Sequence, residues 1–348
     1  MKKILILTQK VDKDDPVLGF FHNWVGELSK RFEKVTVICL EMGSYDLPEN
    51  VKVFSLGKES GRSKVKYVKN FLNLILGLHK EYDAVLVHMN QEYVLLGGFI
   101  WKVMGKRIYM WRNHIYGNIL TRIAVSLSDK VFCTSEFSYT ARFKKTEIMP
   151  VGIDTGLFRK PKFVTRNSNS ILFLGRMSPI KRPDLLIEAL KTLNSQGVPF
   201  EASLYGDPLP KDEAYYNFLK TKVDGSGLGG KVKFYAGVAN QETAAIYGRH
   251  EIFVNLTPSG SFDKTILEAA SCGCILVISN KSLDGEIDGR MLMDADLPEE
   301  IAQKIGYWLK ADQGKKEQAS EELREYVLKK HNLNDLMDRL CKAIHQYV

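Results

Sequence analysis

The chain has 348 residues, of which 45% are hydrophobic and 26% charged, a composition that is typical of a soluble globular enzyme. This length is sufficient for two domains of ordinary size, each of which can bury a core without disulfides or metals. The five cysteines are odd in number and follow no spacing of a disulfide framework or a zinc site, so we expect reduced thiols in an intracellular protein.

The formal net charge of +8 is unevenly distributed along the chain. Residues 1–165 hold 26 Lys and Arg against 16 Asp and Glu, whereas the remainder holds 23 against 25. A basic first half is compatible with an anionic partner such as nucleic acid or an anionic membrane, although for charge alone ordinary surface lysines are the slightly better explanation. No stretch approaches the roughly 20 apolar residues of a spanning helix, and the N-terminal apolar run is too short for a signal peptide. We therefore expect a cytoplasmic protein without a transmembrane anchor.

Short β runs alternate with amphipathic helices in the first half. The pattern predicts strands at 3–8, 34–39, 84–88, 107–111 and 130–134, with helices at 20–32, 92–104 and 118–127. This alternation is typical of βαβ units and parallel sheets.

A polar segment, "RKPKFVTRNSNS" at 159–170, interrupts this rhythm and is predicted to be a linker. A second alternation follows, with strands at 171–175, 200–206, 231–237 and 251–256, helices at 182–195, 211–223 and 241–248, and a helical tail from Pro298. We predict two doubly wound α/β domains in tandem, residues 1–163 and 164–331, and a final helix at about 332–348 that could pack back on the first domain.

Ligands of open parallel sheets bind outside the carboxyl ends of the strands. Five candidate positions follow predicted strands: Gly19, His88, His114, Arg176 and the loop 257–264. We expect the functional site to be built from these loops.

The stretch "FLGRMSPIKRPDLLIEAL" (173–190) places Arg176 and Lys181 on one short loop between a strand and a helix. The planar guanidinium of Arg and the compact charge of Lys suit a diphosphate group. A solvated basic turn would have the same sequence pattern, so the two interpretations remain open from these residues alone.

The stretch "TPSGSFDKTILEAASCG" (257–273) combines small residues with the start of an apolar helix. Ser259, Gly260 and Ser261 allow backbone amides to approach a ligand, and the helix start offers free N–H groups to an anion. Thr265 and Glu268 have the spacing of a capping box, whereas Asp263 is an alternative N-cap. The charge of Asp263 would have to point away from a phosphate or be offset by Lys264.

Taken together, these motifs resemble those of the family 4 glycosyltransferases, which have the GT-B fold. The similarity is carried by "IYGRHEIFVNLTPSGSFDKTILEAASCGCILVISN" (246–280), "SDKVFCTSEFSYTARF" (128–143) and "MPVGIDTGLFRK" (149–160), in the family's order. The GT-B fold consists of two facing Rossmann-like domains with doubly wound parallel sheets and the active site in the cleft between them. The resemblance extends over nearly the whole chain.

The resemblance implies a retaining hexosyltransferase that moves a sugar from a UDP-, GDP- or ADP-sugar to a glycan or lipid-linked acceptor. Cell-surface polysaccharide or glycolipid synthesis would be its setting, with no metal cofactor and no nucleic acid partner. By the same resemblance the catalytic residues are His114, Arg176 and Lys181, and the acceptor side holds His88, Asn90 and His114. The donor-binding set is Gly19, Arg176, Lys181, Gly206, Val238, Ser259, Gly260, Asp263, Lys264, Thr265 and Glu268.

The family pattern has two glutamates separated by seven residues, and this chain matches only the second. Glu268 stands at the second position, which is expected to bind the ribose hydroxyls, while Gly260 stands at the first. Asp263 and Lys264 are the two candidates to replace the contacts of the missing carboxylate with the donor sugar, and the sequence leaves this replacement open. Two alternatives remain: a non-catalytic GT-B protein that binds a nucleotide sugar or glycan, and a nucleotide-sugar epimerase.

Two motifs are set aside. "GSGLGG" (225–230) follows a helix and precedes a strand, the reverse of a dinucleotide-binding turn, and is predicted to be a loop. "DAD" (294–296) resembles a metal-binding acidic pair, but its place before "LPEE" favours helix capping.

The segment 58–82 combines an apolar helical face with a basic start. The apolar positions are Val68, Phe71, Leu72, Ile75 and Leu78, and the cations are Lys58, Arg62, Lys64, Lys66 and Lys69. Core packing explains the apolar face, while the cations also suit an anionic bilayer. Peripheral attachment to the inner face of a membrane is therefore a further expectation.

Overall fold

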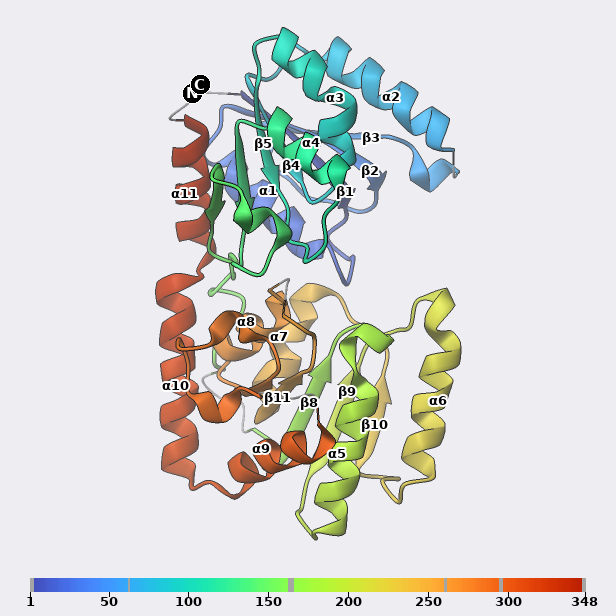
Figure 1. The fold of residues 1–348 in the computed structure, drawn as a ribbon, viewed down its shortest axis with the longest axis vertical. Helices are drawn as coiled ribbons and strands as arrows, with labels where there is room; N and C mark the ends of the chain where they lie inside the picture. Colours follow the sequence, from blue (N-terminus) through green and yellow to red (C-terminus); the bar gives the residue numbers. More distant parts are fainter. Residues whose placement is uncertain (1–2, 62, 162–165, 260–261, 294–296, 346–348) are drawn as a thin grey trace. The chain divides into compact units, whose positions relative to one another are not determined.

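The computed structural model describes all residues except 1–2, 62, 162–165, 260–261, 294–296 and 346–348. The chain divides into two compact units: residues 1–152 with 333–348, and residues 153–332 (Figure 1). The division after Gly152 precedes the predicted linker. Part of that linker, 162–165, and the "DAD" motif lie outside the described residues.

A sheet of seven parallel strands forms the centre of the first unit, in the order β3-β2-β1-β4-β5-β6-β7. Its strands are β1 (Lys3–Val11), β2 (Lys34–Met42), β3 (Val51–Ser55), β4 (Ala84–His88), β5 (Arg107–Trp111), β6 (Lys130–Cys133) and β7 (Thr146–Ile148). The sequence pattern did not indicate β3 and β7, which are the two edge strands and are only partly buried.

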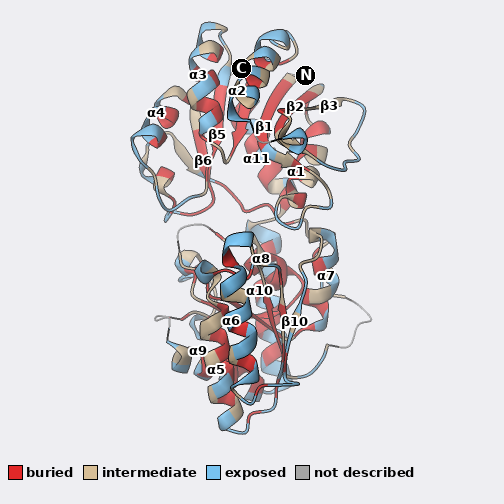
Figure 2. Cartoon of the chain, turned by 90° about the vertical axis from the view of Figure 1, so that its right-hand side faces the viewer, coloured by how far each residue is buried: buried red, intermediate tan, exposed pale blue. Residues whose placement is uncertain are grey.

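Helices cover both faces of this sheet (Figure 1). They are α1 (Gly19–Ser29), α2 (Lys64–Gly77), α3 (Glu92–Val103), α4 (Ile119–Leu127) and α11 (Leu333–His345). Because successive strand residues point to opposite faces, Ile4 and Ile6 join the core beneath α1 and α11, while Leu5 and Leu7 join the core beneath α2, α3 and α4. Figure 2 shows that buried residues are concentrated on the strands and on the inner helix faces.

The apolar face of α2 belongs to the core of the first unit. Phe71 and Ile75 are buried, and Leu72 and Leu78 pack against the same cluster. Core packing of this face is therefore confirmed, and the lysines of α2 lie on the exposed side of the helix.

The second unit has a five-stranded parallel sheet in the order β10-β9-β8-β11-β12. Its strands are β8 (Ser170–Leu174), β9 (Glu201–Tyr205), β10 (Val232–Tyr235), β11 (Ile252–Asn255) and β12 (Ile275–Ile278). Its helices are α5 (Pro183–Ser195), α6 (Glu213–Asp224), α7 (Asn240–Arg249), α8 (Lys264–Ser271), α9 (Pro298–Lys310) and α10 (Gln313–Lys330). The "GSGLGG" segment connects α6 to β10 without regular structure, as predicted.

All five cysteines are buried and form no disulfide. Within the part of the chain that the structure describes, no helix is long and apolar enough to cross a membrane.

Candidate functional site

Each sheet has one point where the strand order reverses. In the second unit β8 pairs with β9 on one side and with β11 on the other, so the chain leaves these strands in opposite directions. The carboxyl ends of strands at such a reversal leave a crevice that commonly binds ligands. The loop of Arg176 and Lys181 follows β8, and the loop before α8 follows β11, so the topology brings the two predicted motifs to one place.

The loop after β8 starts where its backbone lies very close to that of Gly206, after the adjacent strand β9. Gly206, at the end of β9, has φ +144°, and a Cβ on it would lie 1.9 Å from the carbonyl oxygen of Gly175. The Gly175 amide in turn donates to the carbonyl of Tyr205. The close approach of these two backbones fixes the start of the loop that carries Arg176.

Lys181 and Asp263 form an ion pair that joins the two loops. The Lys181 side chain is 17% exposed and that of Asp263 11% exposed, so solvent screens the pair only weakly. Burial raises the pKa of the Asp263 carboxyl, but Lys181 and the hydrogen bonds from Asn255 and Thr265 hold its pKa well below the usual range. Arg176, on the same loop, is exposed.

Asp263 is also the N-cap of α8, as the alternative sequence interpretation proposed. Its carboxylate accepts hydrogen bonds from the Thr265 amide (3.3 Å) and hydroxyl (2.9 Å), from Asn255 Nδ2 (2.9 Å) and from the Thr257 hydroxyl (3.3 Å). The charge that offsets Asp263 is that of Lys181, whereas the sequence interpretation had named Lys264. With all these partners, the carboxylate is occupied in holding the loop and Lys181 in place.

Glu268 does not take part in capping, because α8 begins at Lys264 and the residue lies one turn inside the helix. The carboxylate is 1% exposed and accepts hydrogen bonds from Asn240 Nδ2 (3.2 Å) and the Tyr247 hydroxyl (3.3 Å), both on α7. Burial raises its pKa, while Lys264 acts in the opposite direction. The capping-box interpretation is therefore wrong for this residue. Its carboxylate instead joins α8 to α7 through these two hydrogen bonds.

Lys264 lies at the first position of α8 with its side chain close to Glu268. Burial lowers the pKa of its ammonium to about 8, although the charges of Glu268 and Asp154 oppose this shift. An anion placed at the start of α8 would stabilise the protonated form of Lys264.

Four residues of this site were missed by the sequence interpretation: Asn240, Tyr247, Asn255 and Thr257. The sequence could have indicated Asn255, because it is a polar residue at the end of the apolar strand "IFVN". In the structure its side chain is only 3% exposed. Its amide donates to both Asp263 and Thr265. The two α7 residues could not be paired with Glu268 without the tertiary structure.

Three of the remaining predicted donor residues also lie at the carboxyl edge of this sheet. Val238 is in the connection between β10 and α7, and Gly206 follows β9. Ser259 follows β11 and accepts a hydrogen bond from the Lys281 amide at 2.8 Å. Gly260 lies outside the described residues.

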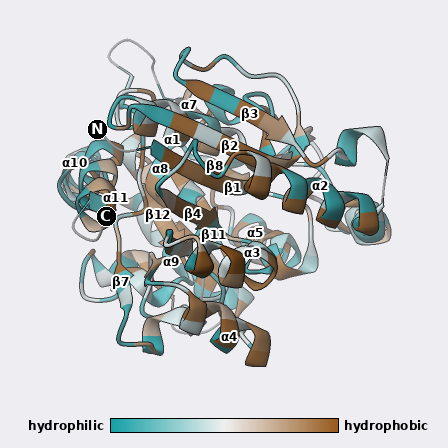
Figure 3. Cartoon of the chain, turned by 90° about the horizontal axis from the view of Figure 1, so that it is seen from above, coloured by the Kyte–Doolittle hydropathy of each residue, from teal (hydrophilic) through white to brown (hydrophobic). Residues whose placement is uncertain are grey.

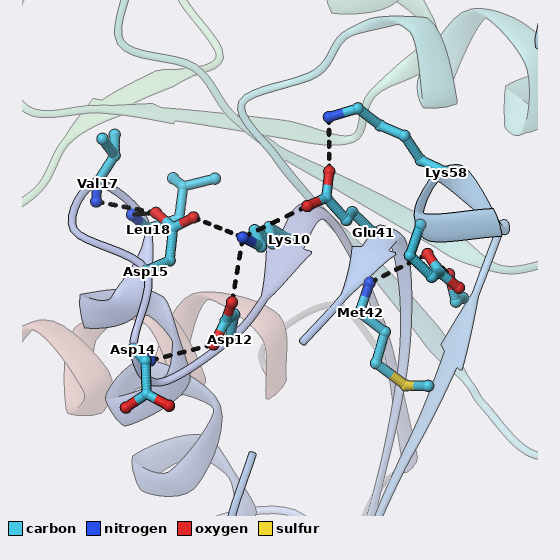
Figure 4. A network of polar contacts seen from close by, with 11 residues as sticks. Lys10, Asp12, Asp14, Asp15, Val17, Leu18, Glu41, Met42 and Lys58 are labelled. Carbon is cyan, nitrogen blue, oxygen red and sulfur yellow. Dashed lines mark hydrogen bonds and ion pairs between the residues drawn. The ribbon is translucent and has the colours of Figure 1, made fainter. Parts of the chain in front are cut away.

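The first unit has its own reversal between β2 and β4, on the two sides of β1. Lys10, near the end of β1, contacts Asp12 (3.1 Å), Asp15 (2.8 Å) and Glu41 (3.4 Å) (Figure 4). Burial lowers the pKa of Lys10, but Asp15 and Asp12 outweigh this effect and raise it. The Asp15 carbonyl accepts a hydrogen bond from the Gly19 amide (3.0 Å), so the network holds the loop before α1 in place.

His88, at the end of β4, is 3% exposed and has the contacts of a core side chain. Its ring stacks on Phe21 at 3.9 Å between centroids, and Nδ1 lies 3.2 Å from the Thr8 hydroxyl oxygen. The resemblance placed His88 on the acceptor side, but these contacts fit support of the surrounding structure better. The following residues, Met89 with φ +68° and the half-exposed Asn90, turn the chain into α3.

His114 is exposed on the loop that connects β5 to α4. The Tyr116 amide donates to its Nδ1 at 3.0 Å, and the His114 carbonyl accepts from the Tyr139 amide at 2.8 Å. The ring is thus oriented by its own loop while remaining accessible. Among the described residues, no group of three His, Cys, Asp or Glu side chains is placed to hold a metal ion.

Comparisons with known proteins agree with this geometry. Residues 168–311 match the family model described as glycosyl transferases group 1. A curated relative, an uncharacterized glycosyltransferase of Methanocaldococcus jannaschii, is 22% identical over 307 residues, which are 83% of this chain and 84% of the relative.

Two solved structures share the whole fold. The Anabaena protein HepE in complex with UDP and glucose has a TM-score of 0.80 at 18% identity, covering 99% of this chain and 100% of that chain. A glycosyltransferase from Rickettsia africae has a TM-score of 0.81 at 15% identity, covering 99% and 98%.

Two Rossmann-like parallel sheets, each with polar residues at its reversal point, define a protein of the GT-B fold. Residues 168–311, within the second unit, match the glycosyl transferases group 1 model, the family that the sequence motifs indicated. The relative that matches over most of the chain is also a glycosyltransferase by its description.

Proposed function

We propose that this protein is a retaining glycosyltransferase that takes a hexose from a uridine diphosphate sugar and transfers it to a glycan or lipid-linked acceptor. The observation that carries the proposal is the meeting of three features at one reversal point of the second sheet: the cations after β8, the start of α8, and the buried carboxylate Glu268. The choice of uridine is supported by HepE, which was solved with UDP and glucose.

The chemistry that these residues supply is stabilisation of the leaving diphosphate. Negative charge develops on the diphosphate as the bond to the sugar breaks, and fixed positive charge at that place lowers the barrier. Arg176 and Lys181 provide two cations, and the free amides of α8 add the positive end of its dipole. Glu268 accepts hydrogen bonds from the ribose hydroxyls.

The exposed ring of His114 orients the acceptor hydroxyl or the reacting sugar in this proposal. The hydroxyl oxygen forms the new bond to the sugar carbon as the bond to the diphosphate oxygen breaks. Its proton passes to the leaving phosphate, which becomes the stronger base during the reaction. In this proposal no metal ion is required, because the cations of the β8 loop stabilise the negative charge that develops on the leaving diphosphate.

The replacement of Arg176 by Ala tests the diphosphate assignment most cleanly, because this side chain is exposed and its loss leaves the Lys181–Asp263 pair intact. UDP affinity measured by calorimetry should fall at least about tenfold, since charge-assisted hydrogen bonds to phosphate are strong. Lys310→Ala, which removes an exposed cation at the end of α9 in the same unit, is the matched control. Unchanged UDP affinity in Arg176→Ala would refute the assignment.

The absence of the first family glutamate motivates the two rival functions, since Gly260 stands in its place. Release of free UDP that depends on both a donor and an acceptor supports the transferase. Binding of donor without any release supports the non-catalytic protein, and conversion of the donor sugar without an acceptor supports the epimerase.

A further inference from the structure

Large apolar side chains are exposed along two neighbouring helices of the first unit, α3 and α4. Phe99 and Val103 on α3 are each 74% exposed, and Ile119 on α4 is 65% exposed. Leu96, Leu120 and Ile123 lie on the same two helices and are exposed by 41–47%. Figure 3 shows hydrophobic colouring on α3 and α4. We call these six residues the apolar face of α3 and α4. Folding of the unit leaves it in contact with solvent, although such surfaces usually mark an interaction site.

The apolar face continues into the loop that carries His114. Ile115 and Tyr116, 42% and 73% exposed, follow His114 directly and precede α4. The loop is rigidly held, because Arg112 donates to the Tyr116 carbonyl at 2.9 Å and a side chain on Gly117 would collide with the Tyr139 ring. The face therefore ends beside the candidate acceptor residue.

The charge around this face is positive on balance. Residues 92–129 contain five cations, Lys102, Lys106, Arg107, Arg112 and Arg122, against two acidic residues, Glu92 and Asp129. Asp129 pairs with Lys102 and Arg107. Arg112 is buried, so Lys106 and Arg122 are the cations of this segment that remain at the surface without those ion pairs. Helix α2 packs beside α3 and adds three exposed lysines to this side of the unit, Lys64, Lys66 and Lys69, without any acidic residue. Apolar side chains surrounded by cations are the combination that binds an anionic bilayer surface.

We propose that the apolar face of α3 and α4 docks this protein on an anionic lipid bilayer. A second copy of the chain fits less well, because a symmetric contact would bring the cations of two identical faces together. A bilayer with acidic headgroups offers a negative surface for the cations and a hydrocarbon boundary for Phe99, Val103 and Ile119.

Docking in this orientation sets the class of acceptor, a step that rests on the proposed transferase function. Because the face ends at Ile115 and Tyr116, a bilayer against it would hold the sugar-bearing headgroup of a lipid beside His114. The structure thus favours a lipid-linked acceptor over a free glycan.

The experiment is sedimentation with vesicles of phosphatidylcholine alone and of equal parts phosphatidylcholine and phosphatidylglycerol. We expect the wild type to bind the mixed vesicles at low salt, to be released by added salt, and to ignore the neutral vesicles. The double variant Phe99→Ser, Ile123→Ser should lower the vesicle partition coefficient at least about tenfold. Arg122→Glu should lower it as well, because it reverses a charge within the face.

Phe218→Ser is the matched control, since Phe218 is 52% exposed on α6 of the second unit and lies outside the proposed surface. Circular dichroism and thermal melting verify that each variant is folded. The proposal is overturned by wild-type protein that does not bind the mixed vesicles, by a double variant that binds as well as wild type, or by a wild-type dimer that the double variant converts to a monomer. UDP affinity measured on the same samples tests the donor site separately, so failure of docking and failure of the proposed function are distinguishable.

Discussion

The pair of Lys181 and Asp263 gives the sharpest test of how the donor loops are held together. Asp263→Asn keeps the size of the side chain and its ability to cap α8, because Asn is as good an N-cap as Asp. It removes the charge that Lys181 faces, together with the oxygen that accepts hydrogen bonds from Asn255 and the Thr257 hydroxyl. The variant therefore separates these contacts of Asp263 from its role as a cap.

The magnitude follows from the burial of the pair. Exposed ion pairs contribute about 0–1 kcal/mol, whereas leaving one partner of a fully buried pair costs about 3–5 kcal/mol. With side chains 17% and 11% exposed, this pair is closer to the buried case, and we expect a loss of about 2–3 kcal/mol. UDP affinity should fall as well, because Lys181 loses the partner that positions its ammonium.

Urea unfolding followed by circular dichroism and by tryptophan fluorescence measures the loss in stability. The buried Trp308 reports on the second unit, which contains the pair. Asp288→Asn is the control, because Asp288 likewise caps a short helix and pairs with a cation, Arg290, that is 49% exposed. We expect less than about 0.5 kcal/mol for this control.

The pH dependence provides a second readout of Asp263. Its pKa in the folded protein is held below the unfolded value near 3.9, so the stabilisation is fully present above that value and is lost as the pH falls below it. The difference between wild type and Asp263→Asn should therefore be constant from neutral pH down to about pH 5 and should shrink below about pH 4. Equal stability of the two proteins at pH 7 would show that the ion pair does not hold the loops.

Three further changes probe other parts of the two sites. Gly206→Ala should cost about 3 kcal/mol or more in thermal unfolding, because the new Cβ would lie 1.9 Å from the Gly175 carbonyl at a φ of +144°; a melting temperature like wild type would contradict this packing. Glu268→Gln should leave the melting temperature at pH 7 unchanged or raise it, because a buried acid with a raised pKa destabilises the fold once it ionises. Calorimetry should show that the same variant binds UDP about tenfold more weakly. A large loss of stability with unchanged UDP affinity would make Glu268 a structural residue. Lys10→Met should destabilise the first unit by about 1–2 kcal/mol in urea, an effect that added salt reduces, because three neighbouring carboxylates lose their shared cation; insensitivity to salt would argue against an electrostatic origin.

The elements that the sequence predicted best are those with strong periodicity and clear ends. The buried strands of both sheets and the helices between them were placed within a few residues, because continuous apolar runs and amphipathic helices leave a direct pattern. The edge strands β3 and β7 were missed, since their residues are only partly buried and alternate weakly. The class of enzyme also followed from the sequence, because its motifs are local and occur in a fixed order.

The roles within the donor site were decided by contacts between elements far apart in the chain. The cation that pairs with Asp263 is Lys181, 82 residues away, although the neighbouring Lys264 was the natural choice from the sequence. Glu268 was separated from the helix cap only when α8 was seen to start at Lys264 and α7 was seen to supply its hydrogen-bond donors.

The sequence by itself determined the fold class and the loops that carry the site, because apolar periodicity and strand ends are local properties. Tertiary structure alone decided which charges meet and which apolar side chains remain outside. The apolar residues of α2 and those of α3 and α4 look alike in the sequence, yet Phe71 is buried and Phe99 is exposed. The reason is physical: a helix buries only the face turned to its sheet, and the packing of the whole unit selects that face.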